Sequence, residues 1–264
     1  MNTTDNIKSL FNSANPMTTE NSYEPSGVCI GDTVLDNTPS GFALFQAIGG
    51  HYTSPAQAIE ELVDNAISSI KANGGSGEVI LRLTDGGDYV DISVYDSGTG
   101  ISDLGAALTI SGCGGAQTPL NEHGCGLKNA LSYLGEEDEL WLLESRTKED
   151  AAADRYRCVS APYAAIDRKM RAKVHQGNGA ILHETGTTIR VRCGKEKLEC
   201  LKPATKRAKA DFRQLCGYLK EELAYTYAAI LAEGSVTIGI ICREQNAHES
   251  CHRLEALEPL WEAD

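Results

Sequence analysis

The stretch YTSPAQAIEELVDNAISSIKANGG, which starts at Tyr52, carries apolar side chains three or four residues apart. Such spacing places side chains on one face of a helix. The positions concerned are Ile59, Leu62, Ala66 and Ile70. Residues suited to a helix start precede them, namely Ser54 as a cap, Pro55 at the first helical position and Gln57 to complete a capping box. A Gly-Gly pair at residues 74–75 stops the run, so the pattern predicts one helix between these signals.

Strand-like runs follow this helix. EVILRLT and YVDISVYD flank the turn sequence Asp85-Gly86-Gly87-Asp88, which predicts an antiparallel hairpin. Four further runs have strand composition: ELWLLES, DRYRCVSA, TTIRVRC and SVTIGIIC. LKNALSYLG predicts a short helix that is closed by Gly135, and residues 205–232 predict one long helix or two. Residues 171–186, between two strand candidates, are interpreted as a loop.

The order of these elements indicates the fold class. Helices that alternate with strands linked mostly as hairpins favour a layered α/β sandwich over a doubly wound parallel sheet. We therefore predict an α/β two-layer sandwich with a mixed, mostly antiparallel sheet that helices cover on one face. Residues 1–40, rich in Asn, Thr, Ser and Pro, are interpreted as a flexible N-terminal arm or strap. Residues 41–245 form the organised domain, and residues 246–264 are a tail or the start of a following domain.

Composition and charge limit the classes of function. The 264-residue chain has 24 Lys and Arg against 37 Asp and Glu, a net charge of -13. This balance argues against a surface built mainly to hold a nucleic-acid backbone. The nine cysteines are scattered and include no C-x-x-C motif, so we expect an intracellular protein, cytoplasmic or nuclear. The longest strongly apolar stretch, SVTIGIIC, has the length of a strand, so we expect no membrane contact.

Two polar side chains lie along the first predicted helix. Residues four apart on a helix are neighbours, so Glu61 and Asn65 project side by side. A carboxylate can orient and deprotonate a water molecule, and a carboxamide oxygen can ligate Mg²⁺, an ion that also bridges phosphates. The pair is what a nucleotide hydrolase needs, although an E-x-x-x-N pattern is also common on solvated helix faces.

Three later stretches add further chemistry in a fixed order. DSGTG ends a strand with Asp96, which can accept a hydrogen bond from an exocyclic amine, and its two glycines let a planar base approach. HGCGLKN opens a helix with two glycines, where free backbone amides and the helix dipole favour phosphate. ETGTTIRV has a Gly-Thr pair that leads into a strand, where the threonine hydroxyl is available beneath a buried carboxylate. The sequence contains no P-loop motif and no dinucleotide-binding glycine fingerprint.

These four elements, in this order and at these separations, resemble the GHKL ATPase superfamily. That superfamily includes DNA gyrase B subunits, heat-shock chaperones of the ninety-kilodalton class, histidine kinases and MutL. The resemblance extends from about residue 40 to residue 242, and it implies the Bergerat ATP-binding fold with ATP and Mg²⁺ as cofactors. AQAIEELVDNA is most similar to MORC and MutL domains, EHGCGLKNALSYLG to gyrase and MORC, and GTTIRV to MutL.

The resemblance implies a role for each matching residue. Glu61 would be the general base for the attacking water, and Asn65 would be the Mg²⁺ ligand. Asp96 would read the adenine amino group, and Thr187 would support Asp96. Lys128 would also add positive charge near the phosphates. Gly98 and Gly100 would shape the base pocket. The residues that would wrap the phosphates through backbone amides are Gly124, Cys125, Gly126, Leu127 and Lys128.

The activity that the resemblance implies is Mg²⁺-dependent binding and hydrolysis of ATP. Residues 111–126 would form an ATP lid, and lid closure together with the N-terminal arm would produce an ATP-dependent homodimer. Histidine kinases of the superfamily usually have asparagine where this chain has Glu61, so water is the favoured phosphoryl acceptor and protein phosphorylation is disfavoured. The alternative is an ATP-sensing interaction module with little or no intrinsic hydrolysis.

Two departures from the family pattern concern the rate of hydrolysis. Many hydrolytic members have an acidic residue where this chain has Ser68. In relatives a cation from a following transducer domain reaches the terminal phosphate, and this sequence ends about where that domain would begin. We therefore expect slow hydrolysis in isolation, and we expect any nucleic-acid or protein partner to bind through further domains. Four cations are interpreted as a solvated helix start or a local contact patch: Lys202, Lys206, Arg207 and Lys209.

Overall fold

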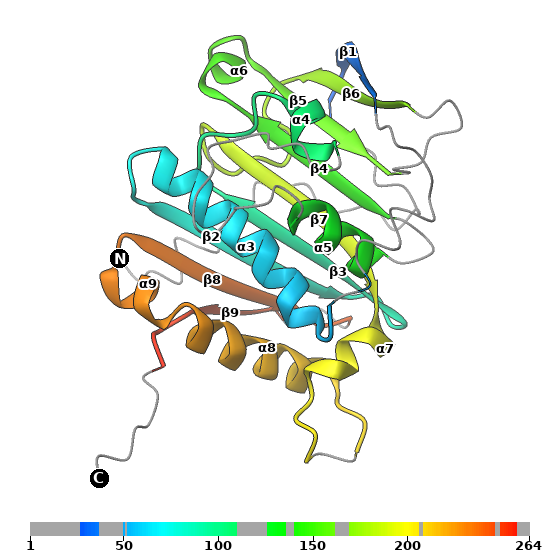
Figure 1. The fold of residues 1–264 in the computed structure, drawn as a ribbon, viewed down its shortest axis with the longest axis vertical. Coiled ribbons are helices and arrows are strands. Elements are labelled where there is room, and N and C mark those ends of the chain that lie inside the picture. The colour runs from blue at the N-terminus through cyan, green and yellow to red at the C-terminus, as the bar shows by residue number, and fades with distance from the viewer. Residues whose placement is uncertain are drawn as a thin grey trace.

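One mixed β-sheet runs through the described structure (Figure 1). The structure is a computed structural model that describes residues 27–36, 50, 52–109, 126–135, 140–161, 169–205, 208–245 and 249–257. In these residues the strands are β1 Cys29–Asp36, β2 Gly77–Asp85, β3 Tyr89–Asp96, β4 Trp141–Arg146, β5 Arg155–Ser160, β6 Lys169–Gln176, β7 Gly186–Gly194, β8 Val236–Arg243 and β9 Glu249–Arg253. Their order in the sheet is β1-β6-β5-β4-β7-β3-β2-β8-β9. Neighbouring strands are antiparallel, except that β2 and β8 pair in parallel.

The longer helices lie over one face of this sheet (Figure 1). Helical segments in the described residues are α3 Pro55–Ala72, α4 Leu104–Leu108, α5 Gly126–Gly135, α6 Lys148–Ala152, α7 Lys195–Leu198, a 3-10 turn Glu199–Leu201, α8 Phe212–Thr226 and α9 Ala228–Glu233. The predicted α/β two-layer sandwich, with a mixed, mostly antiparallel sheet that helices cover on one face, is confirmed. None of the described helices has the length and apolar character needed to span a bilayer.

The main hydrophobic core lies between α3, α5, α8 and the sheet face beneath them. The apolar positions predicted for α3 are all buried in it: Ile59, Leu62, Ala66 and Ile70. Along β3, Val90, Ile92 and Val94 reach the same core, as the alternation of side chains in a strand requires. Burying one Ile or Leu side chain contributes about 1.5–3 kcal/mol. The apolar stripe of α3 therefore fixes the direction in which its polar side chains point.

The ends of α3 follow from local side-chain chemistry. Ser54 Oγ accepts a hydrogen bond from Ala56 N at 3.2 Å, and Pro55 occupies the first turn. The predicted capping box is offset by one residue, because Gln57 Oε1 accepts its hydrogen bond from Thr53 N at 3.0 Å and not from Ser54. At the other end Gly74 has a φ of +102°, a left-handed conformation that suits glycine.

The interpretation of residues 171–186 as a loop is wrong for their first part. Residues up to Gln176 belong to β6, which pairs with β5 and with β1. Basic and apolar side chains alternate in its sequence KMRAKVHQ, and this period of two is typical of a strand with one face toward a core. Ala172 is buried in that core. The alternation is hard to recognise in the sequence, because Ala172 is small and the basic side chains on either side of it are long.

The remaining elements agree with the prediction or refine it. The hairpin β2 and β3, the helix α5 and the strands β4, β5, β7 and β8 are confirmed, with small differences at their ends. The segment predicted as one long helix or two contains α8 and α9, which Tyr227 separates. Strand β1 is the described part of the predicted N-terminal arm, and it pairs antiparallel with β6. The sequence did not predict the short helices α4, α6 and α7. It also did not predict strand β9, which lies in the segment 246–264 and pairs with β8.

Candidate functional site

Glu61 lies where α3 meets the first residue of α5. Its side chain is half-buried, and its carboxylate lies against Gly126. A Cβ atom added to Gly126 would overlap with Glu61 Oε2 and come within 2.9 Å of Glu61 Cδ. The first N–H groups of a helix have no partner within the helix and carry partial positive charge. The structure therefore brings a carboxylate on α3 to a helix end that suits an anion.

Asn65 lies one turn after Glu61 on the same helix. Its Nδ2 donates a hydrogen bond to the Glu61 carbonyl oxygen at 2.6 Å. This bond uses the amide nitrogen and leaves Oδ1 as the acceptor atom of the carboxamide. Oδ1 is a hard, neutral oxygen of the kind that ligates Mg²⁺. Asn65 therefore fits the requirements of one protein ligand to that ion.

Asp96 ends β3 and is buried. Its Oδ1 accepts a hydrogen bond from Gly98 N at 2.8 Å, and its carboxylate also accepts bonds from the backbone N–H and the hydroxyl of Thr187. Burial raises the pKa of Asp96 to about 7, although the hydrogen bonds from Gly98 and Thr187 act to lower it. A strongly shifted carboxyl with defined partners is typical of a functional site.

The segment that follows, residues 96–101, is called here the Asp96 loop. Two of its glycines have no room for a side chain. A Cβ atom at Gly98 would come within 2.6 Å of Ser69 Cβ on α3. Gly100 has a φ of +71°, and a Cβ atom there would come within 2.7 Å of Arg146 C on β4. The glycines therefore let the loop pass close to both elements.

The start of α5 is the predicted phosphate-binding segment. Gly126 and Leu127 are its first residues, whereas Gly124, Cys125 and most of the predicted lid at 111–126 lie outside the described residues. The Lys128 side chain is buried, and its Nζ donates hydrogen bonds to the carbonyl oxygens of Ala107 and Thr109 at 3.0 and 2.9 Å. The Lys128 ammonium is therefore bound at the end of α4.

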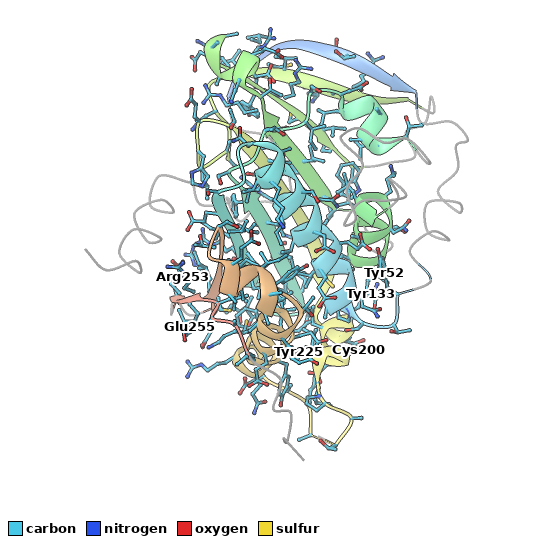
Figure 2. All side chains as sticks on the ribbon, turned by 60° about the vertical axis from the view of Figure 1, so that its left-hand side comes forward. Tyr52, Tyr133, Cys200, Tyr225, Arg253 and Glu255 are labelled. Carbon is cyan, nitrogen blue, oxygen red and sulfur yellow. The ribbon has the colours of Figure 1, made fainter. Side chains whose placement is uncertain are left out.

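The other end of α5 is fixed by aromatic and cationic contacts. Tyr133 of α5 lies next to Tyr52, which precedes α3 (Figure 2), with ring centroids 5.5 Å apart in an edge-to-face arrangement. Lys197 Nζ lies 4.3 Å from the Tyr133 ring centroid and donates a hydrogen bond to the Tyr133 carbonyl oxygen. A cation near the C-terminal end of a helix is favourable. These contacts help to hold α5 in a fixed place beside α3.

Comparison with protein families identifies the family to which this chain belongs. The family model described as "Histidine kinase-, DNA gyrase B-, and HSP90-like ATPase" matches residues 50–196, more than half of the chain. The chain belongs to this family. It therefore carries an ATP-binding domain of the GHKL type. The matched range contains Glu61, Asn65, Asp96 and Thr187.

One solved structure that is similar to this GHKL chain is the N-terminal domain of a DNA repair protein. The two superpose with a TM-score of 0.47 and share 15% sequence identity. The match covers 79% of this chain and 54% of that chain, so this chain spans about half of the length of that structure. No curated protein sequence matches the chain.

The GHKL site also contains residues that sequence reasoning did not single out. Three hydroxyls from different elements contact the Asp96 loop, those of Ser69, Ser145 and Thr185. Gly186 has a φ of +145°, and a Cβ atom there would overlap with the Asp96 carbonyl oxygen. No spacing in the sequence marks these residues, because they become neighbours only when α3, β4 and β7 assemble. The run Thr-Gly-Thr, which leads into β7, is the one local signal.

Tyr227, beyond the range that the GHKL family model matches, contacts the side of α3 that faces α8. Its buried hydroxyl lies 3.0 Å from the Glu60 carbonyl oxygen and 2.9 Å from Asp64 Oδ1. These residues immediately precede Glu61 and Asn65. Burial raises the pKa of Asp64, and the hydrogen bond from Tyr227 offsets part of that increase.

Replacing Tyr227 with phenylalanine is expected to lower the free energy of unfolding by about 1–2 kcal/mol, because a partly buried carboxylate loses its donor. Urea denaturation at pH 8 measures this change. Tyr225→Phe is the matched control, since Tyr225 lies two residues earlier, at the end of α8, and its side chain is exposed (Figure 2). Equal urea midpoints for the two variants would show that the contact between Tyr227 and Asp64 has no energetic weight.

Proposed function

We propose that this domain binds ATP with Mg²⁺ and hydrolyses it with water that Glu61 activates. The observation that carries the proposal is the contact between the Glu61 carboxylate and Gly126 at the start of α5. It places a proton acceptor beside the helix end that would bind the terminal phosphates. Nucleotide binding alone does not need an acceptor there, whereas attack by water on a phosphorus atom does.

Adenine recognition would take place at the Asp96 loop. The Asp96 carboxylate would accept a hydrogen bond from the exocyclic amine, and Thr187 holds that carboxylate by two hydrogen bonds. Gly98 and Gly100 would shape the base pocket by letting the loop lie close to α3 and β4. The phosphates would be held by backbone N–H groups at the start of α5, those of Gly124, Cys125, Gly126, Leu127 and Lys128.

Asn65 would supply the protein ligand to Mg²⁺. Its Nδ2 donates to the Glu61 carbonyl oxygen, and this hydrogen bond restricts rotation of the carboxamide. The bound ion would supply positive charge that stabilises the transferring phosphoryl group. Glu61 would orient the water molecule and accept its proton as the bond to phosphorus forms.

The wider cycle follows from the MORC and MutL resemblance of the sequence. ATP would order the lid at residues 111–126, and the closed lid with the arm at residues 1–40 would form the surface of a homodimer. Residues 41–245 would be the ATP-binding unit, and β9 of the segment 246–264 extends its sheet by pairing with β8. The rest of that segment would be a tail or the start of a transducer domain. The described cysteines are all free thiols. This supports an intracellular location, cytoplasmic or nuclear.

A second candidate function is an ATP-sensing interaction module with little intrinsic hydrolysis. Two described cations that could assist phosphoryl transfer are bound elsewhere. Lys128 Nζ is bound to carbonyl oxygens at the end of α4, and Lys202 Nζ donates to the Ala208 carbonyl oxygen at 3.0 Å. Hydrolysis by this chain would then be slow unless a partner supplied a cation at the terminal phosphate.

Calorimetric titration with ATP, in the presence of Mg²⁺ and in the presence of a chelator, tests the binding part of the proposal. We expect saturable binding that Mg²⁺ strengthens, and an Asn65→Ala variant that binds ATP equally well with and without Mg²⁺. Phosphate release measured in the same samples distinguishes the two candidate functions. Absence of ATP binding by the wild-type protein would contradict both of them.

Replacing Gly126 with alanine is expected to slow ATP turnover about ten-fold or more, because the new Cβ atom would push the Glu61 carboxylate aside. The carboxylate is the free end of a flexible side chain, so the thermal midpoint should change by only about 2–3 °C. Gly217→Ala on α8 is the control, since a Cβ atom there meets nothing within 4 Å. Equal turnover in the two variants would count against a catalytic position for Glu61.

A further inference from the structure

Thr185 joins the β6–β7 connection to the Asp96 loop. Its buried hydroxyl donates a hydrogen bond to the Gly98 carbonyl oxygen at 2.6 Å. The next two residues contact Asp96 itself, since Gly186 lies against its carbonyl oxygen and Thr187 donates to its carboxylate. Three consecutive residues therefore hold the beginning of the loop from one side.

Two serine hydroxyls hold the rest of the Asp96 loop from other sides. Ser69 Oγ on α3 accepts a hydrogen bond from Thr99 N at 3.1 Å. Ser145 Oγ on β4 accepts one from Ile101 N at 2.6 Å, and the Ser145 side chain is fully buried. Backbone groups at three of four consecutive residues of the loop are therefore bound by side-chain hydroxyls. These hydroxyls come from three separate parts of the fold: α3, β4 and the β6–β7 connection.

The Asp96 loop needs such support because of its composition. Gly98 and Gly100 make the backbone conformationally permissive, so the free loop would sample many arrangements. Adenine recognition requires one arrangement, with the Asp96 carboxylate directed at the exocyclic amine. Guanine presents a carbonyl oxygen, which is an acceptor, at the corresponding position. A fixed carboxylate would bind the amine and repel the carbonyl oxygen, whereas a movable carboxylate would discriminate poorly.

We propose that Ser69, Ser145 and Thr185 form a hydroxyl clamp that presets the Asp96 loop and so sets the selectivity of this domain for adenine nucleotides. The inference rests on the proposed binding of ATP, and it does not depend on hydrolysis. The clamp residues are positioning residues, because their hydroxyls contact the loop backbone and not the nucleotide.

Thr185 offers the sharpest test, because valine has nearly the same shape without the hydroxyl and serine keeps the hydroxyl without the methyl group. Dissociation constants for ATP and GTP would be measured by calorimetry for wild type, Thr185→Val and Thr185→Ser. We expect Thr185→Val to raise the ATP dissociation constant about ten-fold. We also expect it to reduce the preference for ATP over GTP by a similar factor. Thr185→Ser should keep both the affinity and the preference of the wild-type protein.

Thr188→Val is the matched control for Thr185→Val. Thr188 is a buried threonine three residues further along, in β7, and its hydroxyl donates to the Ala180 carbonyl oxygen at 3.0 Å, away from the Asp96 loop. The Thr188→Val variant should be somewhat less stable than the wild-type protein and should keep its preference for ATP over GTP. Ser69→Ala serves as a second clamp variant, because Ser69 is only partly buried and the variant is expected to fold.

The outcomes separate the clamp from the proposed function. Wild-type protein that binds ATP, with Thr185→Val and Ser69→Ala that keep its affinity and base preference, would overturn the clamp alone. An equal loss of base preference in Thr188→Val would also overturn it, since the effect would then be general. Wild-type protein that binds no ATP would overturn the proposed function and the clamp together.

Discussion

Replacing Glu61 with glutamine is expected to lower the rate of ATP turnover by at least about 100-fold, the usual size of a general-base contribution. Glutamine has the shape of glutamate but cannot accept the proton of the attacking water. The ATP dissociation constant should stay within about three-fold of the wild-type value, because binding rests on the Asp96 loop and on backbone N–H groups of α5. Steady-state phosphate release and calorimetric titration measure the two quantities.

Glu60→Gln is the control for this variant. Glu60 is the neighbouring residue, but its Oε1 accepts a hydrogen bond from Thr226 Oγ1 at 2.9 Å on the side of α3 that faces α8. We expect wild-type turnover from Glu60→Gln. Full turnover in Glu61→Gln, or an equal loss in both variants, would show that Glu61 is not the base.

ATP affinity is expected to fall steeply as the pH decreases below 7. The pKa of Asp96 is raised to about 7 by burial, so at pH 6 about nine molecules in ten carry the protonated carboxyl. The ionised form is the better acceptor for the adenine amine, so affinity should rise with pH and level off above 8. Titrations from pH 5.5 to 8.5 should show about a five-fold loss of affinity from pH 7 to pH 6 and about a ten-fold loss from pH 8 to pH 6.

Asp96→Asn is the control, because the variant should bind ATP weakly and should show only the pH dependence of the nucleotide itself. The stability of the nucleotide-free protein should depend on pH in the opposite direction. The folded-state pKa of Asp96 lies above its unfolded value, so its contribution to stability is present at low pH and is lost as the pH rises through 7. ATP affinity that does not change between pH 6 and pH 8 would contradict the role of Asp96.

Elements with local signals could be predicted from the sequence. The apolar spacing and caps of α3 lie within one continuous stretch, and the hairpin β2 and β3 is defined by its own turn. Strand β6 could not be recognised, because its long basic side chains conceal an alternation that matters only when β1 and β5 pair with it. The short helix α4 has too few residues to show a helical period.

In the candidate site, too, residues with a local sequence signal could be predicted and contacts between distant elements could not. Glu61, Asn65 and Asp96 stand in short runs whose chemistry can be recognised residue by residue. The contact between Glu61 and Gly126 could not be predicted, because it depends on how α3 and α5 pack. The Lys128 ammonium, which the resemblance directs to the phosphates, is bound at the end of an unpredicted helix. The clamp hydroxyls carry no motif, since serine and threonine are common everywhere in the chain.

The most direct test of the central claim follows the terminal phosphoryl group of ATP. Excess wild-type protein would be mixed with Mg²⁺ and ATP labelled in its terminal phosphate, and the label would be followed in inorganic phosphate and on protein. Water activated by Glu61 predicts that all released label appears as inorganic phosphate, and that Glu61→Gln binds ATP but releases almost none. Label that accumulates on the protein, or equal release from wild type and Glu61→Gln, would contradict the proposed mechanism.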